Sequence, residues 1–203
     1  MIDFSAPADV VAPQLLGCFL THNGVTLRIT EVEAYLGSDD PAAHGYRGKT
    51  ARNAAMFGPP GRFYVYLSYG IHLNGNIVCA PEGTGHGCLL RAGEVVAGEA
   101  TARERRQAPR KGVRGGKPAT KDIEHVNLAR GPGNLGCALG LTLADNGAPV
   151  AIAPRSTGPG AEPARVEWVA GPRIGISKNA DAPLRFWIPG DPTVSPPRGR
   201  PHP

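Results

Sequence analysis

Alternating hydrophobic and polar residues in the first half of the chain predict a series of short strands joined by turns. Cys18–His22 and Val25–Tyr35 predict the first two strands, because the intervening Asn23-Gly24 is a strong signal for a hairpin turn. Three further strands are predicted over Arg62–Tyr69, His72–Ala80 and Gly87–Val95.

Helices and shorter strands account for the rest of the pattern. Asp9 can cap a short helix whose length Pro13 limits, and Thr50 can cap a helical turn through Met56. No internal repeat or linker divides the chain, so residues 1–203 are interpreted as a single domain. Further helices are predicted over Val96–Gln107, Asp122–Ala129 and Leu135–Leu139, and further strands over Ala151–Ala153, Val166–Val169 and Leu184–Trp187.

The composition suits a compact protein outside the membrane. The chain has 203 residues, of which 41% are hydrophobic, and no apolar run is long enough to span a bilayer. The N-terminus shows no secretory signal, so we expect an intracellular protein, in the cytoplasm or nucleoid, or in the nucleus of a eukaryote. The scattered cysteines form no C-x-x-C pair, which predicts reduced, buried thiols and no metal site: Cys18, Cys79, Cys88 and Cys137.

Positive charge gathers in one part of the sequence. The net charge of +5 is compatible with nucleic acid but does not prove such a partner. A basic cluster could neutralise phosphates, although residues 107–118 could equally be a solvated, mobile loop, and one loop could do both. The proline-rich end, residues 192–203, is expected to fray. The cluster contains Arg103, Arg105, Arg106, Arg110, Lys111, Arg114, Lys117 and Lys121, with only Glu104 among them.

One carboxylate on the second predicted strand calls for a chemical explanation. The period of two puts Leu27, Ile29, Glu31, Glu33 and Tyr35 on one face of that strand. Glu33 would then lie beside an aromatic ring on a face that otherwise points to the core. A charged group in such a place needs a reason.

Excision of a base from duplex DNA requires a set of groups that this chain supplies. The base must leave the stack and enter a pocket, usually between aromatic rings. A carboxylate must deprotonate a water while the sugar develops positive charge, and basic groups must hold the distorted backbone. These groups are concentrated in Glu33-Ala34-Tyr35-Leu36-Gly37, Ala42-Ala43-His44 and Tyr64-Val65-Tyr66-Leu67-Ser68-Tyr69-Gly70, followed by Asn76 and Arg91.

These segments resemble the alkyladenine DNA glycosylases, also called 3-methyladenine or methylpurine DNA glycosylases. Each motif alone would be weak, but the three in this order are highly specific. The resemblance implies an α+β fold: a single mixed domain in which a curved antiparallel β-sheet, flanked by helices, carries the pocket. It covers most of the chain, running through Thr30–Arg91 and resuming at Gly131–Leu135, Arg173-Ile174-Gly175 and Pro183–Phe186.

The resemblance also implies the catalytic and base-binding roles of matching residues. Glu33 would be the general base that activates water, and Arg91 and the backbone carbonyl of Ile174 would help to hold that water. The flipped base would be sandwiched by the rings of Tyr35, His44 and Tyr66. Asn76 would crowd the exocyclic amino group of guanine, so that normal guanine is rejected.

Contacts with the DNA follow from the same resemblance. Tyr69 would be inserted into the minor groove in place of the extruded base, because Gly70 after it is consistent with a tight turn that exposes the ring. Other DNA contacts are expected from Arg52, Arg103, Arg106, Arg110 and Lys111.

Each of these residues also has a simpler interpretation. Glu33 could be a surface glutamate on a hairpin. Arg91 could form a stabilising salt bridge with Glu33, which would not exclude its catalytic role. The pocket rings could be ordinary aromatic packing, Tyr69 could be a buried tyrosine at a strand end, and the Asn76 amide could be satisfied by backbone.

The implied activity is that of a monofunctional DNA glycosylase of base excision repair. It would hydrolyse the N-glycosidic bond of alkylated or deaminated purines, such as 3-methyladenine, hypoxanthine and ethenoadenine, with no cofactor or metal. Since no active-site lysine is indicated, the product would be an abasic site without strand cleavage. The expected partner is double-stranded DNA containing damaged purines, bound by a monomer. Three departures from the family pattern are Leu73-Asn74-Gly75, the longer loop Glu82–Gly87 and the basic insertion after Gln107.

Three other interpretations compete with this one. Gly131-Pro132-Gly133 resembles part of a helix-hairpin-helix glycosylase, for which Asp145 is the only near candidate for the catalytic aspartate. A zinc deaminase is excluded because its H-x-E…P-C-x-x-C signature is absent. A non-catalytic binding module for distorted or damaged duplex explains the charge and Tyr69, but gives no reason for Glu33 beside Tyr35.

Overall fold

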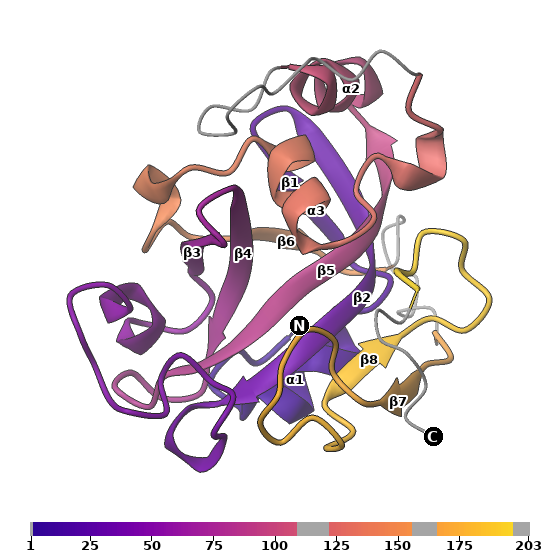
Figure 1. Ribbon diagram of the computed structural model, residues 1–203. Coiled ribbons are helices and arrows are strands. Elements are labelled where there is room, and N and C mark those ends of the chain that lie inside the picture. The colour runs from indigo at the N-terminus through magenta and orange to yellow at the C-terminus, as the bar shows by residue number, and fades with distance from the viewer. Residues whose placement is uncertain (1, 109–121, 156–165, 197–203) are drawn as a thin grey trace.

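The long strand β2 (Val25–Leu36) organises the sheet of the computed structural model, which describes residues 2–108, 122–155 and 166–196 (Figure 1). All strand pairings are antiparallel, in the order β3-β4-β5-β2-β1-β6. Strand β8 pairs with the second half of β2 and with β7. The other strands are β1 (Phe19–His22), β3 (Phe63–Ser68), β4 (His72–Cys79), β5 (His86–Ala97), β6 (Ala151–Ala153), β7 (Val169–Gly171) and β8 (Arg185–Trp187).

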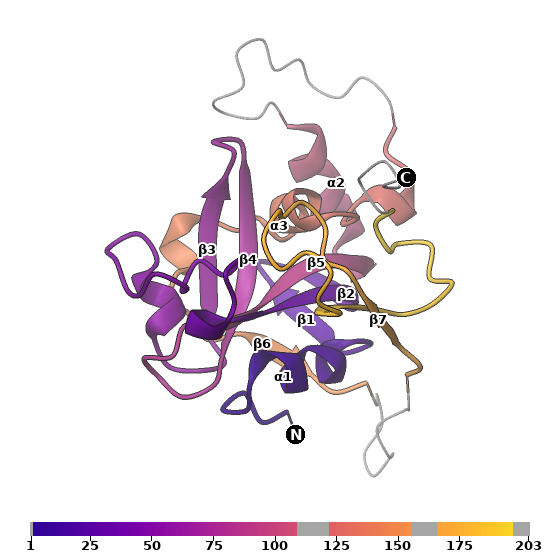
Figure 2. The ribbon, with the colours of Figure 1, turned by 60° about the horizontal axis from the view of Figure 1, so that its bottom comes forward.

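Within the described ranges, three α-helices flank this sheet. Helix α1 (Ala8–Leu15) lies on one side, whereas α2 (Glu99–Gln107) and α3 (Pro132–Leu139) lie together on the other (Figure 2). Their apolar residues join those of the strands in one main core. The predicted α+β fold, with a curved antiparallel sheet flanked by helices, is confirmed. Among the described residues no helix is both long and apolar enough to cross a membrane.

A β-bulge in β2 changes which side chains face the core. Leu27 and Ile29 lie in the main core, but beyond residue 30 the even-numbered residues take over those positions. The register between β2 and β5 shifts between residues 29 and 32, where the extra residue of a bulge redirects the side chains that follow. The prediction that Leu27 and Ile29 share a face with Glu31, Glu33 and Tyr35 is therefore wrong.

Several element boundaries differ from the sequence predictions. Helix α1 begins at Ala8 without a side-chain cap, so Asp9 lies in its first turn and does not cap it. Thr50 hydrogen-bonds to the side chain of Asn53, and the helical turn starts after that residue, as a 3-10 helix over Ala54–Phe57. Thr50 and Asn53 satisfy each other locally, so Thr50 does not cap the helical turn.

The second half of the chain shows similar shifts. Strand β5 continues through Ala97, so α2 starts only at Glu99, and α3 starts at Pro132 because proline is well tolerated in a first helical turn. The predicted helix Asp122–Ala129 is reduced to a 3-10 turn over His125–Asn127, and the predicted strand Val166–Val169 is replaced by β7.

The described part of the C-terminal segment, residues 192–196, packs against β2. Thr193 and Ser195 are buried, and the backbone N–H of Ser195 donates to Glu31 Oε2 over 2.7 Å. This differs from the expected frayed tail, because a buried carboxylate requires donors and the segment supplies them. The rest of that tail, residues 197–203, lies outside the described residues, as do residues 109–118 of the predicted basic loop.

The four cysteines are free thiols, as predicted, and Cys18, Cys79 and Cys88 are buried. Cys137 is only partly buried, so the prediction of a buried thiol is wrong there. Cys79 and Cys88 lie on neighbouring strands in the core with their sulfur atoms 3.6 Å apart. In the part of the chain that the structure describes, no group of three or more His, Cys, Asp or Glu residues could hold a metal ion.

Candidate active site

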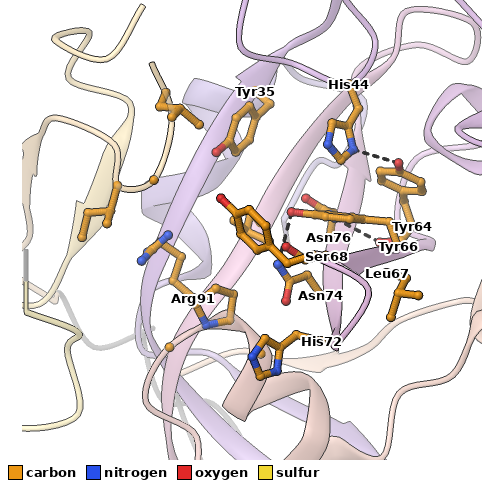
Figure 3. A pocket seen from close by; sticks show the side chains of 18 of the residues that line it. Tyr35, His44, Tyr64, Tyr66, Leu67, Ser68, His72, Asn74, Asn76 and Arg91 are labelled. Atoms are coloured by element: carbon orange, nitrogen blue, oxygen red, sulfur yellow. Dashed lines mark hydrogen bonds between the residues drawn. The ribbon is translucent and has the colours of Figure 1, made fainter. Parts of the chain in front are cut away.

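A cavity of about 690 Å³ lies between the end of β2, the β3–β4 hairpin and the part of β5 around Leu89 and Arg91 (Figure 3). The N-terminus of α3 and residues 174–176 close its other sides. The structure therefore brings together residues that are far apart in the sequence. Eight of the predicted site residues line this cavity: Tyr35, His44, Arg52, Tyr66, Tyr69, Asn76, Arg91 and Ile174.

Glu33 lies directly behind three of these lining residues. Its side chain is fully buried, and Oε1 accepts the backbone N–H of Ile174 over 2.7 Å and lies 3.2 Å from Arg91 Nη1. The Tyr35 hydroxyl donates to Oε2 over 2.9 Å. A surface glutamate on a hairpin is thereby excluded, whereas the salt bridge to Arg91 is present.

The contact made by Ile174 differs in kind from the one implied by the resemblance. Its backbone N–H points to Glu33 and acts as a donor. The implied contact between the Ile174 carbonyl and a water stays a prediction.

Burial and charge fix the protonation of the groups around Glu33. Burial, with a further contribution from the Glu33 carboxylate, raises the pKa of Tyr35 well above its ordinary value. For Arg91, burial alone would lower the pKa, but the carboxylates of Glu33 and Glu31 outweigh it and raise the pKa above the ordinary value. Both groups therefore keep their protons near neutral pH and donate.

Arg91 is held by a second buried carboxylate, Glu31. Arg91 Nε donates to Glu31 Oε1 over 2.9 Å, and Arg185 Nε donates to the same oxygen over 2.7 Å. The hydroxyl of Ser195 also donates to Glu31. Burial opposes ionisation of Glu31, but Arg91, Ser195 and Arg185 together lower its pKa below the ordinary value. An ionised Glu31 thus fixes the guanidinium that faces Glu33.

Aromatic rings form two facing parts of the cavity wall. Tyr64 and Tyr66 alternate with core residues on β3, as the sequence predicts, and stack with centroids 5.7 Å apart. The His44 ring meets Tyr66 edge-on at 4.5 Å and hydrogen-bonds through Nδ1 to the Tyr64 hydroxyl over 2.9 Å. In Figure 3, Tyr35 stands apart from this group, across the cavity. All three predicted rings line the cavity, and Tyr35 and Tyr66 also pack against the small apolar cluster of Met56, Phe57, Tyr64 and Val78.

Two asparagines from β4 lie on the same side of the sheet as the tyrosines. Asn76 is buried, and its Nδ2 donates to the backbone oxygen of Tyr64 over 3.1 Å, so its amide is partly satisfied by backbone. Asn74 lies opposite Tyr66 in the strand register and donates to its hydroxyl over 3.2 Å. The departure at Leu73-Asn74-Gly75 thus places an additional amide in the cavity wall.

Tyr69 stands at the tip of the β3–β4 hairpin. It is 85% exposed, so a buried tyrosine at a strand end is excluded. Its φ of 50°, followed by 69° at Gly70, places both residues in the left-handed region. A bulky residue rarely adopts that conformation, which makes the exposed ring a candidate for function. Leu67 and Ile71 beside it are also partly exposed.

The predicted DNA-contacting arginines have diverse environments. Arg52 is exposed at the cavity. Arg103 is bound by Glu99 and Asp122, and Arg106 donates to backbone oxygens of residues 127 and 128. These contacts explain both arginines within the fold, and their DNA contacts stay a prediction. Arg110 and Lys111 lie outside the described residues.

Sequence reasoning gave no role to the buried charges behind the cavity. Glu31 carried a signal, since a second carboxylate two residues before Glu33 interrupts an apolar strand. Asp40 and Arg173 pair with each other over 133 positions, and no local pattern predicts such a contact.

Known proteins match almost the whole chain. The family described as methylpurine-DNA glycosylase matches residues 2–192. A protein of Corynebacterium efficiens, named "Putative 3-methyladenine DNA glycosylase", is 62% identical over 98% of this chain and 97% of its own length. Proteins of the same name from Corynebacterium glutamicum and Cutibacterium acnes are 61% and 50% identical, each over 98% of this chain and over 98% and 100% of their own lengths. The chain therefore belongs to the methylpurine-DNA glycosylase family, whose members are hydrolases of N-glycosyl bonds.

Proposed function

We propose that this protein excises damaged purines from double-stranded DNA, using Glu33 to activate the water that attacks the deoxyribose. The observation that carries the proposal is the set of donors around Glu33. A carboxylate offers about four positions for hydrogen bonds. The Ile174 N–H and the Tyr35 hydroxyl occupy two of them, and Arg91 forms an ion pair with Oε1. A position remains for a water, and all three partners of the carboxylate line the cavity.

The cavity suits a purine that has left the helix. Aromatic side chains on opposite sides supply stacking surfaces for a flat ring, with Tyr35 on one side and His44 and Tyr66 on the other. Tyr69 would occupy the gap that the base leaves in the duplex, since its exposed ring lies at the tip of a hairpin that borders the cavity.

The chemistry needs only groups that the chain supplies. As the bond between the anomeric carbon and the purine nitrogen breaks, positive charge develops on the sugar. The bound water adds to that carbon, Glu33 accepts its proton, and the purine leaves with the electrons of the broken bond. A positioned base of this kind contributes roughly 10²–10⁴-fold to the rate. The product is an abasic site with both strands intact.

The charge of the base decides how much help it needs. The relatives' names specify 3-methyladenine, a cationic base that leaves as a neutral molecule. Hypoxanthine and ethenoadenine are neutral and would depend more strongly on the cavity for hydrogen bonding or protonation. We place all three bases within the proposed substrate class. The enzyme would act on duplex DNA, which one copy of the chain would bind.

Single-turnover excision with a Glu33→Gln variant tests this proposal. The substrate is a duplex with one hypoxanthine, and alkali converts abasic sites into measurable strand breaks. We expect the rate to fall at least 10²-fold while binding to the lesion duplex is retained. Glu94→Gln is the matched control, because Glu94 lies on β5 in an ion pair with Arg28 and does not line the cavity.

Two outcomes would refute the proposal in different ways. A Glu33→Gln protein that excises at the wild-type rate would remove Glu33 from the mechanism. A wild-type protein that binds damaged duplex but releases no purine would make the chain a binding module.

A further inference from the structure

A buried ion pair between Asp40 and Arg173 lies behind the cavity and has no part in the chemistry described above. Both side chains are fully excluded from solvent. The two guanidinium nitrogens Nη1 and Nη2 each donate to one carboxylate oxygen, the second over 2.8 Å. Such a fork fixes the relative orientation of both groups as well as their distance.

Asp40 connects the two segments that carry the facing rings. Its carboxylate accepts the backbone N–H of Leu36 over 3.4 Å, next to Tyr35. It also accepts the backbone N–H of Ala42 over 3.1 Å, two residues before His44. A displacement of this one side chain would therefore be felt on both sides of the cavity.

Arg173 connects the same place to Glu33. Its Nη1 donates to the backbone oxygen of Ala34 over 2.9 Å, the residue between Glu33 and Tyr35. Its guanidinium carbon lies 4.6 Å from the centroid of the Tyr35 ring, and the next residue, Ile174, supplies the N–H that binds Glu33.

The Nε atom of Arg173 indicates that the position of the guanidinium matters as well as its charge. Within the described residues, Arg173 Nε is buried without a hydrogen-bond partner. An unsatisfied buried donor is unfavourable, so the guanidinium is held where its stacking on Tyr35 and its fork to Asp40 require it.

We propose that Asp40 and Arg173 are a positioning pair, which holds Tyr35 opposite His44 and aims the Ile174 N–H at Glu33. The inference rests on the proposed function, since it assigns the pair a task in that same site. A positioning role differs from a purely structural one because it makes the excision rate and the stacking of the base depend on the fork geometry of Arg173.

Arg173→Lys tests this assignment, because lysine keeps the charge but lacks the planar fork. Asp40→Asn is the second variant, since it keeps the shape of the side chain and removes its charge. Arg28→Lys is the matched control. Arg28 also pairs with an aspartate, Asp191, over 2.7 Å, and it lies on the same strand as Glu33 but does not line the cavity.

The assay uses a duplex that contains one ethenoadenine, whose fluorescence reports how its ring is stacked. Emission of the bound complex, single-turnover excision and the melting temperature are measured for all four proteins. We expect Arg173→Lys and Asp40→Asn to excise at least tenfold more slowly and to change the emission of the bound base. Arg28→Lys should match the wild type in rate and emission, whatever its melting temperature.

Each outcome decides between the two roles. If Arg173→Lys and Asp40→Asn excise and fluoresce as the wild type does, the pair is only structural and the inference fails. The same conclusion follows if rates fall in proportion to melting temperature in all three variants, or if neither site variant folds. A wild-type protein without activity on this duplex and on the hypoxanthine duplex would instead refute the proposed function.

Discussion

Tyr69 offers a test in which stability and function should change in opposite directions. The residue is 85% exposed and its φ is 50°, so the fold gains little packing from the ring while the backbone is held in an unfavourable region. Asparagine tolerates that region because its short polar side chain bonds locally. Tyr69→Asn therefore removes the ring and relieves the backbone together.

The gain in stability can be estimated from the backbone alone. A left-handed conformation costs an ordinary residue about 1–2 kcal/mol, and asparagine recovers part of that. For a chain of this size, about 1 kcal/mol corresponds to a rise of roughly 2–4 °C in melting temperature. We expect an increase in this range, since the ring that is lost contributes little to the core.

The loss in DNA binding can be estimated from the ring. If Tyr69 stacks in the duplex in place of the extruded base, its removal should cost about 1–3 kcal/mol, the range measured for stacking of a base on an aromatic side chain. That corresponds to a loss of roughly 5- to 150-fold in affinity for a lesion duplex. Undamaged duplex should be affected less, because no base is extruded there.

Melting curves and fluorescence-anisotropy titrations with lesion and undamaged duplex measure the two effects. Asn23→Gly is the matched control, since Asn23 also has a positive φ, of 46°, but lies in the β1–β2 turn and does not line the cavity. It should leave the affinity unchanged. A Tyr69→Asn protein that melts at or below the wild-type temperature would refute the strain argument, and unchanged affinity for the lesion duplex would refute the insertion of the ring.

Four further changes test the packing and the buried charges. Gly136→Ala should destabilise the fold by about 1–3 kcal/mol, because the added Cβ would lie 1.9 Å from the Leu73 carbonyl oxygen, although alanine normally favours a helix; a melting curve measures this. Glu31→Gln should cost about 3–5 kcal/mol in urea unfolding, because it leaves buried guanidinium groups uncompensated. In the folded protein the pKa values of Asp40 and Glu31 lie below the ordinary 3.8 and 4.5. The stability that these carboxylates provide is therefore complete above the ordinary values and is lost as the pH falls through the folded-state values. A melting temperature that stays constant between pH 5 and pH 3 would contradict this. Glu33→Asp keeps the charge but withdraws it by one methylene, and single-turnover excision should fall nearly as far as in Glu33→Gln.

The sequence allowed the sheet and most of the cavity to be predicted, because both depend on local signals. The hairpin turn at Asn23-Gly24 and the alternation on β3 are set by neighbouring residues, and the structure has both. The same alternation placed Tyr64 and Tyr66 on one face. Other local signals failed, since the caps predicted from Asp9 and Thr50 did not form.

The features that were not predicted depend on long-range contacts. The bulge in β2 turns Glu31 and Glu33 away from the core, and its register shift is set by the pairing with β5. Ser195, which donates a hydrogen bond to Glu31, is 164 positions away from it, and Asp40 and Arg173 are 133 positions apart. No spacing rule links such residues, so their contacts become visible only once the chain is folded. Together they form a layer of buried charge behind the cavity, which consists of Glu31, Asp40, Arg91, Arg173 and Arg185.

This layer of charge also limits what Glu33 can do. Arg91 lies between the carboxylates of Glu33 and Glu31, and Arg185 also pairs with Glu31. Two guanidinium groups thus face two carboxylates, so the negative charge of Glu33 is largely balanced inside the protein. A balanced carboxylate contributes little long-range field to a positively charged sugar. Its advantage is orientation, because its donors fix the lone pair that a water would use. Catalysis by this site would therefore depend more on the position of that lone pair than on the charge behind it.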